Sequence, residues 1–475
     1  MSKKVAVVLA AGEGTRMRSA RSKVVHEVAG RPMLSWVLDA ARLAGCSELV
    51  VVVGHGAEAV REVAAAADVR FAVQAEQLGT GHALAQARAL LPDEATVLVL
   101  SGDVPLVRPA TLDRLAAAAD SNWGALAIAD LEQPGSLGRV LTRDGGKYLE
   151  RIVEVADAEP EVLAVQTINA GIYALPAPAI FSSLAALETD NAQGQYYLTD
   201  ALGAAAAAGE RVALVVLDDA SEAFGANDRR DLARIHRAFI DRKLAELSAC
   251  GVTVLDPATT SVEPAVAVGA DCVLHPGVNL SGSSSIGAGS LLHQGAWLRN
   301  SQIGEGVVIE PYSVLDGASV ADGCRVGPFA RLRPGAELAS GAKVGNFVEI
   351  KNSKLGPGAK AGHLAYLGDA EIGAGSNIGA GVVTCNYDGE HKHRTVIGER
   401  SFVGSDTMLV APVVIGDEAT TAAGSVINRD VPAGALGVSR AKQRNVEGWA
   451  ARKLKTKKTV AAAEGAAETT SEGGD

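Results

Sequence analysis

The sequence is poor in aromatic residues, in paired cysteines and in long apolar runs. Aromatics make up 4% of its 475 residues, so aliphatic side chains must fill the core. The five cysteines form no Cys-x-x-Cys pair and no even set, which favours reduced thiols over disulfides or a zinc site. No apolar run approaches the roughly 18 residues of a membrane span. A net charge of −11 argues against a general nucleic-acid binder. These absences predict a cytoplasmic protein that is not embedded in a membrane.

Glycine, by contrast, is abundant and unevenly distributed. Residues 1–250 contain 19 of the 53 glycines, and residues 251–475 contain 34. We therefore expect the two halves to follow different structural rules. At about 150 residues per domain, the length predicts two to three domains.

Short Val-rich runs alternate with Ala-rich helical patterns in the first half. The predicted strands are Val5–Leu9, Leu49–Val53, Val97–Leu100 and Val212–Leu217, and predicted helices include Met33–Leu43 and Thr80–Leu91. Continuous apolar strands separated by helices predict a mostly parallel sheet that is buried on both faces. Because ligands bind outside the carboxyl ends of such strands, we expect the chemistry in the loops after Leu9, Val53 and Leu100.

The loop after the first predicted strand, Leu9–Met17, reads Leu-Ala-Ala-Gly-Glu-Gly-Thr-Arg-Met. It matches neither the G-x-G-x-x-G fingerprint nor the P-loop. Its two glycines, Gly12 and Gly14, still let backbone N–H groups approach an anion, while Arg16 and Lys23 add positive charge. An ordinary βα turn also favours glycine, but the two nearby cations favour a phosphate cradle.

The tripeptide Ser101-Gly102-Asp103 follows the predicted strand Val97–Leu100. A carboxylate at the carboxyl end of a strand can hold Mg²⁺, which prefers oxygen ligands and substrate phosphates. A single loop Asp more often serves as a turn or cap residue. Metal binding and turn formation therefore both remain open for Asp103.

Further polar motifs follow in a fixed order. They are Gln74, Gly79-Thr80-Gly81, Gly138-Arg139, Glu154, Asn169-Ala170-Gly171 and Asn227. Together with Leu9–Met17 and the Lys about a turn later, this set resembles the sugar-nucleotide pyrophosphorylases. The stretch Gln74–Gly81 resembles those that make UDP-N-acetylglucosamine.

The second half carries an apolar residue at every sixth position. The repeating positions are Val268, Leu274, Leu280, Ile286, Leu292 and Leu298, then Val326, Leu332, Leu338, Val344 and Ile350, and finally Ile397, Val403, Leu409 and Ile415. A six-residue period predicts a parallel β-helix, with small residues at its corners. Steps of five residues, from 298 to 303 and from 350 to 355, predict register adjustments. The break between Ile378 and Ile397 predicts a loop ejected from the coils.

Two further segments, one between these halves and one at the end of the sequence, also allow a structural prediction. Residues 227–250 carry apolar side chains at helical spacing and predict a linking helix. The segment after Thr459 is rich in Ala, Glu, Gly and Thr without periodicity, and it predicts a disordered tail. The predicted parts are therefore a domain at 1–226, a helix at 227–250, a β-helix at 251–458 and a tail at 459–475.

Both halves, in this order, resemble one family from about residue 3 to about residue 455. The motifs in the second half are Arg331–Gly335, Val344–Lys351, Gly362–Gly368, Asn377–Gly381 and Cys385–Gly389. The chain is similar to the bifunctional N-acetylglucosamine-1-phosphate uridyltransferase/glucosamine-1-phosphate acetyltransferases, the GlmU family. The resemblance implies a Rossmann-like α/β nucleotidyltransferase domain, a connecting helix and a left-handed β-helix. It also implies a homotrimer in which neighbouring β-helices share each acetyl-transfer site.

The resemblance implies two reactions and assigns residues to both. The β-helix transfers acetyl from acetyl-CoA to glucosamine-1-phosphate, with His363 as general base, since a histidine can accept a proton near neutral pH. Positions that match the sugar-phosphate site are Arg333, Lys351, Tyr366 and Asn377, and those that match the acetyl-CoA site are Ala380, Asn386, Tyr387, Ser405, Ala423 and Arg440.

The first half then transfers uridylate from UTP to N-acetylglucosamine-1-phosphate, with Mg²⁺ as cofactor, and releases pyrophosphate. In this resemblance Asp103 and Asn227 match the Mg²⁺ ligands, while Arg16 and Lys23 stabilise charge on the phosphates. Positions that match the UDP-N-acetylglucosamine site are Leu9, Ala10, Ala11, Gly12, Lys23, Gln74, Gly79, Thr80, Ser101, Gly102, Asp103, Gly138, Glu154, Asn169 and Asn227.

The chain departs from the family pattern at three positions. Ser22 stands where Pro is usual, Ser101 where Tyr is usual, and Ala170 where Thr is usual. None of these changes removes a charged or metal-binding side chain, although the loop near Lys23 could gain mobility. Two alternatives remain: a pyrophosphorylase whose β-helix is purely structural, and a non-enzymatic scaffold that binds nucleotide sugars.

Overall fold

A computed structural model describes residues 3–187 and 194–468, the last five of these by their backbone alone. The chain forms two compact units, Met1–Gly323 and Cys324–Asp475, which are described separately. Within the described residues, no helix is both long enough and apolar enough to cross a membrane. All five cysteines are free thiols. The predicted domain boundaries stay predictions.

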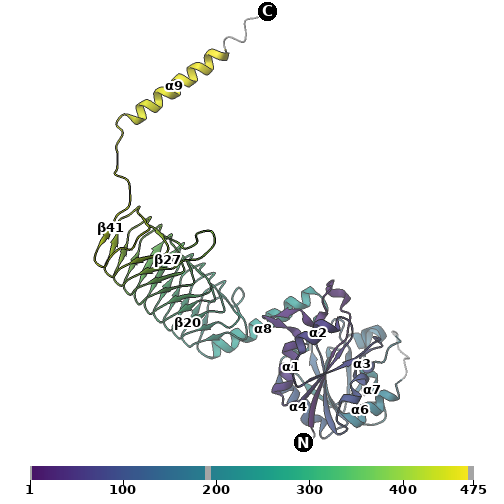
Figure 1. The fold of residues 1–475 in the computed structure, drawn as a ribbon. Helices are drawn as coiled ribbons and strands as arrows, with labels where there is room; N and C mark the ends of the chain where they lie inside the picture. Colours follow the sequence, from purple (N-terminus) through teal and green to yellow (C-terminus); the bar gives the residue numbers. More distant parts are fainter. Residues whose placement is uncertain (1–2, 188–193, 469–475) are drawn as a thin grey trace, which may run out of the picture. The chain divides into compact units, whose positions relative to one another are not determined.

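The first unit contains a nine-stranded sheet in the order β5-β4-β1-β6-β10-β7-β11-β9-β8 (Figure 1). Its strands are β1 (Lys3–Ala10), β4 (Glu48–Val53), β5 (Val69–Val73), β6 (Ala95–Ser101), β7 (Gly124–Asp130), β8 (Arg139–Arg143), β9 (Tyr148–Val153), β10 (Thr167–Pro176) and β11 (Val212–Val216). The pairs β1–β4, β1–β6, β4–β5 and β7–β11 are parallel, as the Val-rich runs predict. Strand β10 is antiparallel to β6 and β7, so the sheet is mixed.

Helices cover both faces of this sheet, which is why its central strands carry buried apolar residues on both faces. One face packs against α1 (Met33–Leu43), α2 (Ala57–Ala64) and α4 (Pro109–Ala119), and the other against α3 (Thr80–Gln86), α6 (Ala177–Ala185) and α7 (Leu198–Ala207). The predicted helix Met33–Leu43 is confirmed at both ends. The predicted helix Thr80–Leu91 is shorter, because a 3-10 turn, Arg88–Leu90, replaces its last part.

The predicted linking helix is α8 (Arg229–Ala249). Asp228 caps it: its carboxylate accepts hydrogen bonds from the backbone N–H groups of Arg230 and Asp231, and Asp231 reciprocates toward the N–H of Asp228. This capping box fixes the residue just before it, Asn227, at the entrance to the helix. The first unit then ends in short parallel strands, from β12 (Thr253–Val254) to β23 (Ser319–Val320).

The second unit is a stack of three-stranded coils, each of which places one short strand in each of three parallel sheets (Figure 1). In the coils of both units, all of the repeating aliphatic residues but Val268 are at most 3% exposed, so the six-residue period marks the core. The shortened steps are confirmed, since Ile303 and Leu355 are buried. Glycine at the turns is sterically required: a Cβ on Gly373 would lie 2.5 Å from the backbone nitrogen of Glu399 in the next coil.

Two features interrupt or follow the coils. Residues 386–394 leave the stack between β34 (Val383–Cys385) and β35 (Thr395–Ile397), where the sequence predicts an ejected loop. Helix α9 (Trp449–Glu468) extends into the segment predicted to be a disordered tail, residues 459–475, and the disorder of this segment stays a prediction. Ala, Lys and Glu have high helix propensity even without an apolar stripe, which explains the helix. Residues 469–475 lie outside the described residues.

Candidate active sites

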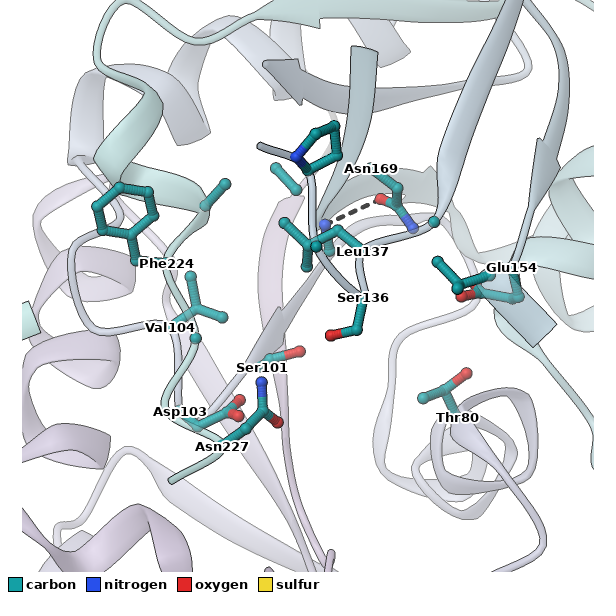
Figure 2. Close-up of a pocket in the computed structure, with 18 of the residues that line it drawn as sticks. Thr80, Ser101, Asp103, Val104, Ser136, Leu137, Glu154, Asn169, Phe224 and Asn227 are labelled. Atoms are coloured by element: carbon teal, nitrogen blue, oxygen red, sulfur yellow. Dashed lines mark hydrogen bonds between the residues drawn. The ribbon is translucent and has the colours of Figure 1, made fainter. Parts of the chain in front are cut away.

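A cavity of about 890 Å³ opens at the carboxyl ends of β1 and β6. Nine of the residues predicted for uridyl transfer line it: Leu9, Arg16, Thr80, Ser101, Asp103, Gly138, Glu154, Asn169 and Asn227. Figure 2 shows Asp103 and Asn227 next to each other, and Thr80 and Glu154 on another side of the cavity. The sheet thus brings together residues that are far apart in sequence, from Leu9 to Asn227.

The two predicted metal ligands are each held by a predicted phosphate cation. The Lys23 ammonium forms an ion pair with the Asp103 carboxylate, and Arg16 Nη2 donates to Asn227 Oδ1 at 3.0 Å. The backbone also joins the two segments, because the N–H of Ala226 donates to the carbonyl of Asp103 at 3.1 Å. Two adjacent oxygen donors fit Mg²⁺, which keeps several waters and takes the rest of its ligands from substrate phosphates.

The polar groups around Glu154 form a second cluster in the same cavity. Thr199 Oγ1 donates to Glu154 Oε1 at 3.3 Å, and Asn169 Nδ2 donates to Tyr173 Oη at 2.8 Å. Burial raises the pKa of Glu154, against a smaller lowering effect of the Thr199 hydroxyl. Burial likewise raises the pKa of Tyr173. Neutral donors and one half-buried carboxyl are suited to the hydroxyl and amide groups of a sugar.

Strand β10 is irregular where it carries Asn169. Its register against β7 shifts between Asn169 and Tyr173, and Gly171 has φ 70°. The N–H of Gly171 donates to Asn169 Oδ1 at 2.9 Å, the bond drawn in Figure 2. This bulge turns the Asn169 amide toward the cavity instead of along the pleat.

Several predicted residues support the cavity without lining it. Gln74 is buried, and its Nε2 donates to the carbonyl of Gly79 at 3.1 Å, which fixes the turn before Thr80. The N–H of Gly102 donates to the carbonyl of Leu9 at 2.9 Å and joins the first and third predicted loops. The remaining predicted residues that do not line the cavity are Ala10, Ala11, Gly12 and Lys23.

The loop after Val53 contributes no residue to the cavity lining, and the expectation of chemistry there stays a prediction. In the sheet, β4 lies on the side of β1 away from β6. Its loop packs against the first loop instead, since the N–H of His55 donates to the carbonyl of Ala11 at 3.3 Å.

The three departures from the family pattern are accommodated in different ways. Ser22 is 2% exposed, and among the described residues its hydroxyl has no hydrogen-bond partner. Ser101 and Ala170 both line the cavity, and Ala170 is 4% exposed.

In the second unit, His363 ends strand β30 (Lys360–His363) and lies on an exposed corner of the coils. The preceding coil places Asn346, the last residue of β27 (Lys343–Asn346), in register with it. His363 Nδ1 and Asn346 Oδ1 are 2.6 Å apart.

Predicted acetyl-CoA residues continue along the same corner on the following coils. The N–H of Gly381 donates to the carbonyl of Leu364 at 3.0 Å, and that of Asp406 donates to the carbonyl of Ala380 at 2.7 Å. Next along the stack, the N–H of Gly424 donates to the carbonyl of Ser405 at 2.8 Å. Arg440 Nη1 then donates to the carbonyl of Ala423 at 2.8 Å. His363, Ala380, Ser405, Ala423 and Arg440 therefore follow one line.

The predicted phosphate cations lie on a neighbouring sheet with β28 (Glu349–Lys351) and β31 (Tyr366–Gly368). Arg333 Nη1 is 2.8 Å from Glu349 Oε1. The pKa of Lys351 is lowered, chiefly by Lys392 of the ejected loop and also by Arg333. Three cations that repel one another form a site that an anion would stabilise.

Tyr366 and Asn386 approach each other closely on this sheet. A Cβ on Gly368 would lie 2.5 Å from Tyr366 Oη and 2.9 Å from Asn386 Nδ2. Asn386 Nδ2 also donates to Asp369 Oδ2 at 2.5 Å. Asn386, predicted to contact acetyl-CoA, is thus placed with the sugar-site residue Tyr366.

Two further predicted residues are Tyr387 and Asn377. Tyr387 lies in the ejected loop and donates from its hydroxyl to the carbonyl of Gly389. Asn377 begins β33 (Asn377–Ile378), opposite Lys360 in the coil before.

Sequence reasoning missed several residues that the structure places beside the predicted ones. They are Tyr173, Thr199, Asn346 and Lys392. Lys392 lies three residues after the motif Cys385–Gly389, and Asn346 lies inside the motif Val344–Lys351. Their places in or near these motifs marked Asn346 and Lys392 as candidates, but only the coil register shows which side chains they contact.

Comparisons with known proteins cover both units. A model of the MobA-like NTP transferase domain matches residues 6–208, and one of six bacterial transferase hexapeptide repeats matches residues 394–429. "Bifunctional protein GlmU" of Syntrophotalea carbinolica is 50% identical over 94% of this chain and 96% of its own. The proteins of that name from Pelobacter propionicus (47%; 96% and 100%) and Azotobacter vinelandii (50%; 93% and 97%) match similarly.

Relatives described as bifunctional match along both halves, which disfavours a single activity or a scaffold without activity. The fold is an α/β nucleotidyltransferase domain followed by a left-handed parallel β-helix of hexapeptide repeats. The chain belongs to the GlmU family and is an enzyme with both uridyltransferase and acetyltransferase activity.

Proposed function

We propose that the cavity of the first unit transfers uridylate from UTP to N-acetylglucosamine-1-phosphate, and that the His363 corner first acetylates glucosamine-1-phosphate with acetyl-CoA. The observation that carries the uridyl-transfer assignment is the pairing of two oxygen donors, Asp103 and Asn227, with two cations, Lys23 and Arg16. A divalent cation can bind the two oxygen donors, and the phosphates of an anionic substrate can bind the two cations.

In uridyl transfer, an oxygen of the sugar phosphate attacks the α-phosphorus of UTP, the bond to the β-phosphate oxygen breaks, and pyrophosphate leaves. Bound Mg²⁺, held by Asp103 and Asn227, would neutralise phosphate charge. Arg16 and Lys23 stabilise the charge that develops on the transferred group and the leaving group. Glu154, Asn169 and Thr80 orient the two substrates, so catalysis consists of positioning and electrostatics.

In acetyl transfer, the amine of glucosamine-1-phosphate attacks the thioester carbonyl of acetyl-CoA. His363 accepts the amine proton as the C–N bond forms, and the C–S bond then breaks to release CoA. Arg333, Lys351 and Lys392 hold the sugar phosphate, which their mutual repulsion favours. Acetyl-CoA lies along the corner of Ala380, Ser405, Ala423 and Arg440, where Ser405 is placed to donate to the oxyanion.

We further propose a homotrimer that acts in the cytoplasm, where UTP and acetyl-CoA are available. Three apolar side chains, Phe329, Phe347 and Leu364, are 48–60% exposed on the corner beside His363. The first two stack with ring centroids 5.4 Å apart. An exposed apolar strip of this kind is typical of a subunit interface. Sedimentation equilibrium tests the proposal: the expected mass is three times that of the chain, and a monomer would contradict it.

A paired assay tests the assignment of the two sites. It measures CoA released from acetyl-CoA and glucosamine-1-phosphate, and pyrophosphate released from UTP and N-acetylglucosamine-1-phosphate. We expect His363→Ala to reduce only the first by about 100-fold or more, and Asp103→Asn to reduce only the second by a similar factor.

Each variant is the other's control for folding. Asp113→Asn is a matched control, because Asp113 forms only a surface ion pair with Lys4 and should leave both activities unchanged. Loss of both activities in either site variant, or of neither, would contradict the assignment.

A further inference from the structure

Asn346 and His363 occupy equivalent positions on consecutive coils. They are register partners in the pairing of β27 with β30, and Asn346 Oδ1 lies 2.6 Å from His363 Nδ1. Among the described residues, His363 Nε2 has no hydrogen-bond partner, and the ring is exposed. The contact therefore leaves one ring nitrogen engaged and the other open to a substrate.

An amide oxygen can only accept a hydrogen bond, so its partner Nδ1 must carry the proton. In neutral imidazole the other nitrogen then carries the lone pair. From this geometry we infer that Asn346 is a positioning residue that selects the catalytic tautomer of His363, with Nδ1 protonated and Nε2 ready to accept the amine proton. The inference rests on the proposed role of His363 as general base.

The backbone around Asn346 holds its side chain in place. Its carbonyl accepts the N–H of Leu364 at 3.0 Å, so both ends of the Asn346–His363 step are tied to the neighbouring coil. The next residue, Phe347, has φ 56° and stacks on Phe329. The Asn346 side chain thus starts from a fixed Cα, which reduces the entropy lost when it orders the ring.

The choice of an amide over a carboxylate also has a physical consequence. The two strands that flank β30 are β27 (Lys-Val-Gly-Asn) and β33 (Asn-Ile), and neither carries an acidic residue. Their titratable group is Lys343, which is in register with Lys360 and not with His363. Asn346 therefore orients the ring without adding the negative charge that would stabilise imidazolium and remove the base at neutral pH.

Three variants test the inference on the full chain. We expect Asn346→Ala to lower kcat for acetyl transfer by about 10- to 100-fold, with less than a threefold change in KM and with uridyl transfer unchanged. Asn346→Asp retains the acceptor, so it should recover most of kcat at high pH. Its acidic limb in the kcat/KM profile should lie at higher pH than that of the wild type, because the carboxylate favours imidazolium. A side chain with a merely structural role would not move this limb.

A double-mutant cycle separates this inference from the proposed function. If Asn346 acts through His363, Asn346→Ala should have no further effect in the His363→Ala background. An equal loss in both backgrounds, an unchanged kcat in Asn346→Ala, or an unmoved limb in Asn346→Asp would overturn the inference. If His363→Ala itself kept full acetyl transfer, the general-base proposal would fail first.

Discussion

The Lys23 ammonium is ion-paired with the carboxylate of Asp103, a residue that lines the uridyl-transfer cavity. Both side chains are about one-sixth exposed, at 18% and 17%. Arg16 likewise donates a hydrogen bond to the side-chain oxygen of Asn227. Each candidate metal ligand thus has a cation as its partner. Binding of a metal–nucleotide complex must exchange these partners, so that the oxygens turn to the metal and the cations turn to the phosphates.

This exchange predicts opposite effects of Lys23→Met on metal binding and on activity. The change frees Asp103, so the affinity for Mn²⁺, a spectroscopic substitute for Mg²⁺, should rise about 3- to 10-fold, the range of a partly exposed ion pair. Uridyl transfer should fall at least 100-fold, since a phosphate cation is lost. Electron paramagnetic resonance measures free Mn²⁺ directly. An affinity that stayed equal or fell would contradict the exchange.

Glu154→Gln tests the sugar end of the cavity and carries a pH signature. Burial raises the pKa of Glu154, so its contribution to stability is present below the unfolded-state pKa and is lost as pH rises through the folded-state pKa. The Gln variant avoids this penalty. It should melt about 1–3 °C higher than wild type at pH 8 and show no difference near pH 4.

The same change should raise KM for N-acetylglucosamine-1-phosphate about 10-fold, because one charged hydrogen-bond acceptor is lost. Glu150→Gln is the matched control, since Glu150 is an exposed residue of β9. Equal melting temperatures of Glu154→Gln and wild type at pH 8 would show that the ionised Glu154 carboxylate does not destabilise the folded protein.

The sequence allowed the elements to be predicted far better than the contacts within the sites. Continuous Val-rich runs and a six-residue period depend on which faces are buried, and burial is a local property of the chain. The exchange of partners between Lys23 and Asp103 depends on sheet order, which places β1 beside β6 but leaves the loop after Val53 outside the cavity. Asn346 lies 17 positions before His363, and no local pattern relates them until the coils are stacked.

Lys392→Met tests whether the ejected loop completes the phosphate site. In the wild type, Lys392 lowers the pKa of Lys351, so Lys351 loses its proton at lower pH than an ordinary lysine. Removing Lys392 should raise KM for glucosamine-1-phosphate about 5- to 20-fold at pH 7.5, since one charged contact is lost. The alkaline rise of KM should also move to higher pH, because Lys351 then keeps its proton longer.

Lys354→Met is the control for this change, since Lys354 pairs with Glu337 on a different sheet. It should leave both the value of KM and its pH profile unaltered. If the pH dependence of KM for glucosamine-1-phosphate were the same in Lys392→Met and the wild type, the ejected loop would not belong to the phosphate site.

Gly14→Ala asks whether the glycine loop acts on catalysis through Lys23. Gly14 has φ 63°, and a Cβ there would lie 2.8 Å from the Cβ of Lys23, closer than two carbons can pack. The variant must therefore move the lysine away from Asp103, and uridyl transfer should fall about 10- to 100-fold while acetyl transfer stays unchanged. Gly145→Ala is the matched control, because Gly145 has φ 71° with no atom within 4 Å of the added carbon. Both variants carry the same backbone strain of about 1 kcal/mol, so both should melt a few degrees lower. Equal losses of uridyl transfer in the two variants would mean that strain alone, and not the position of Lys23, controls the reaction.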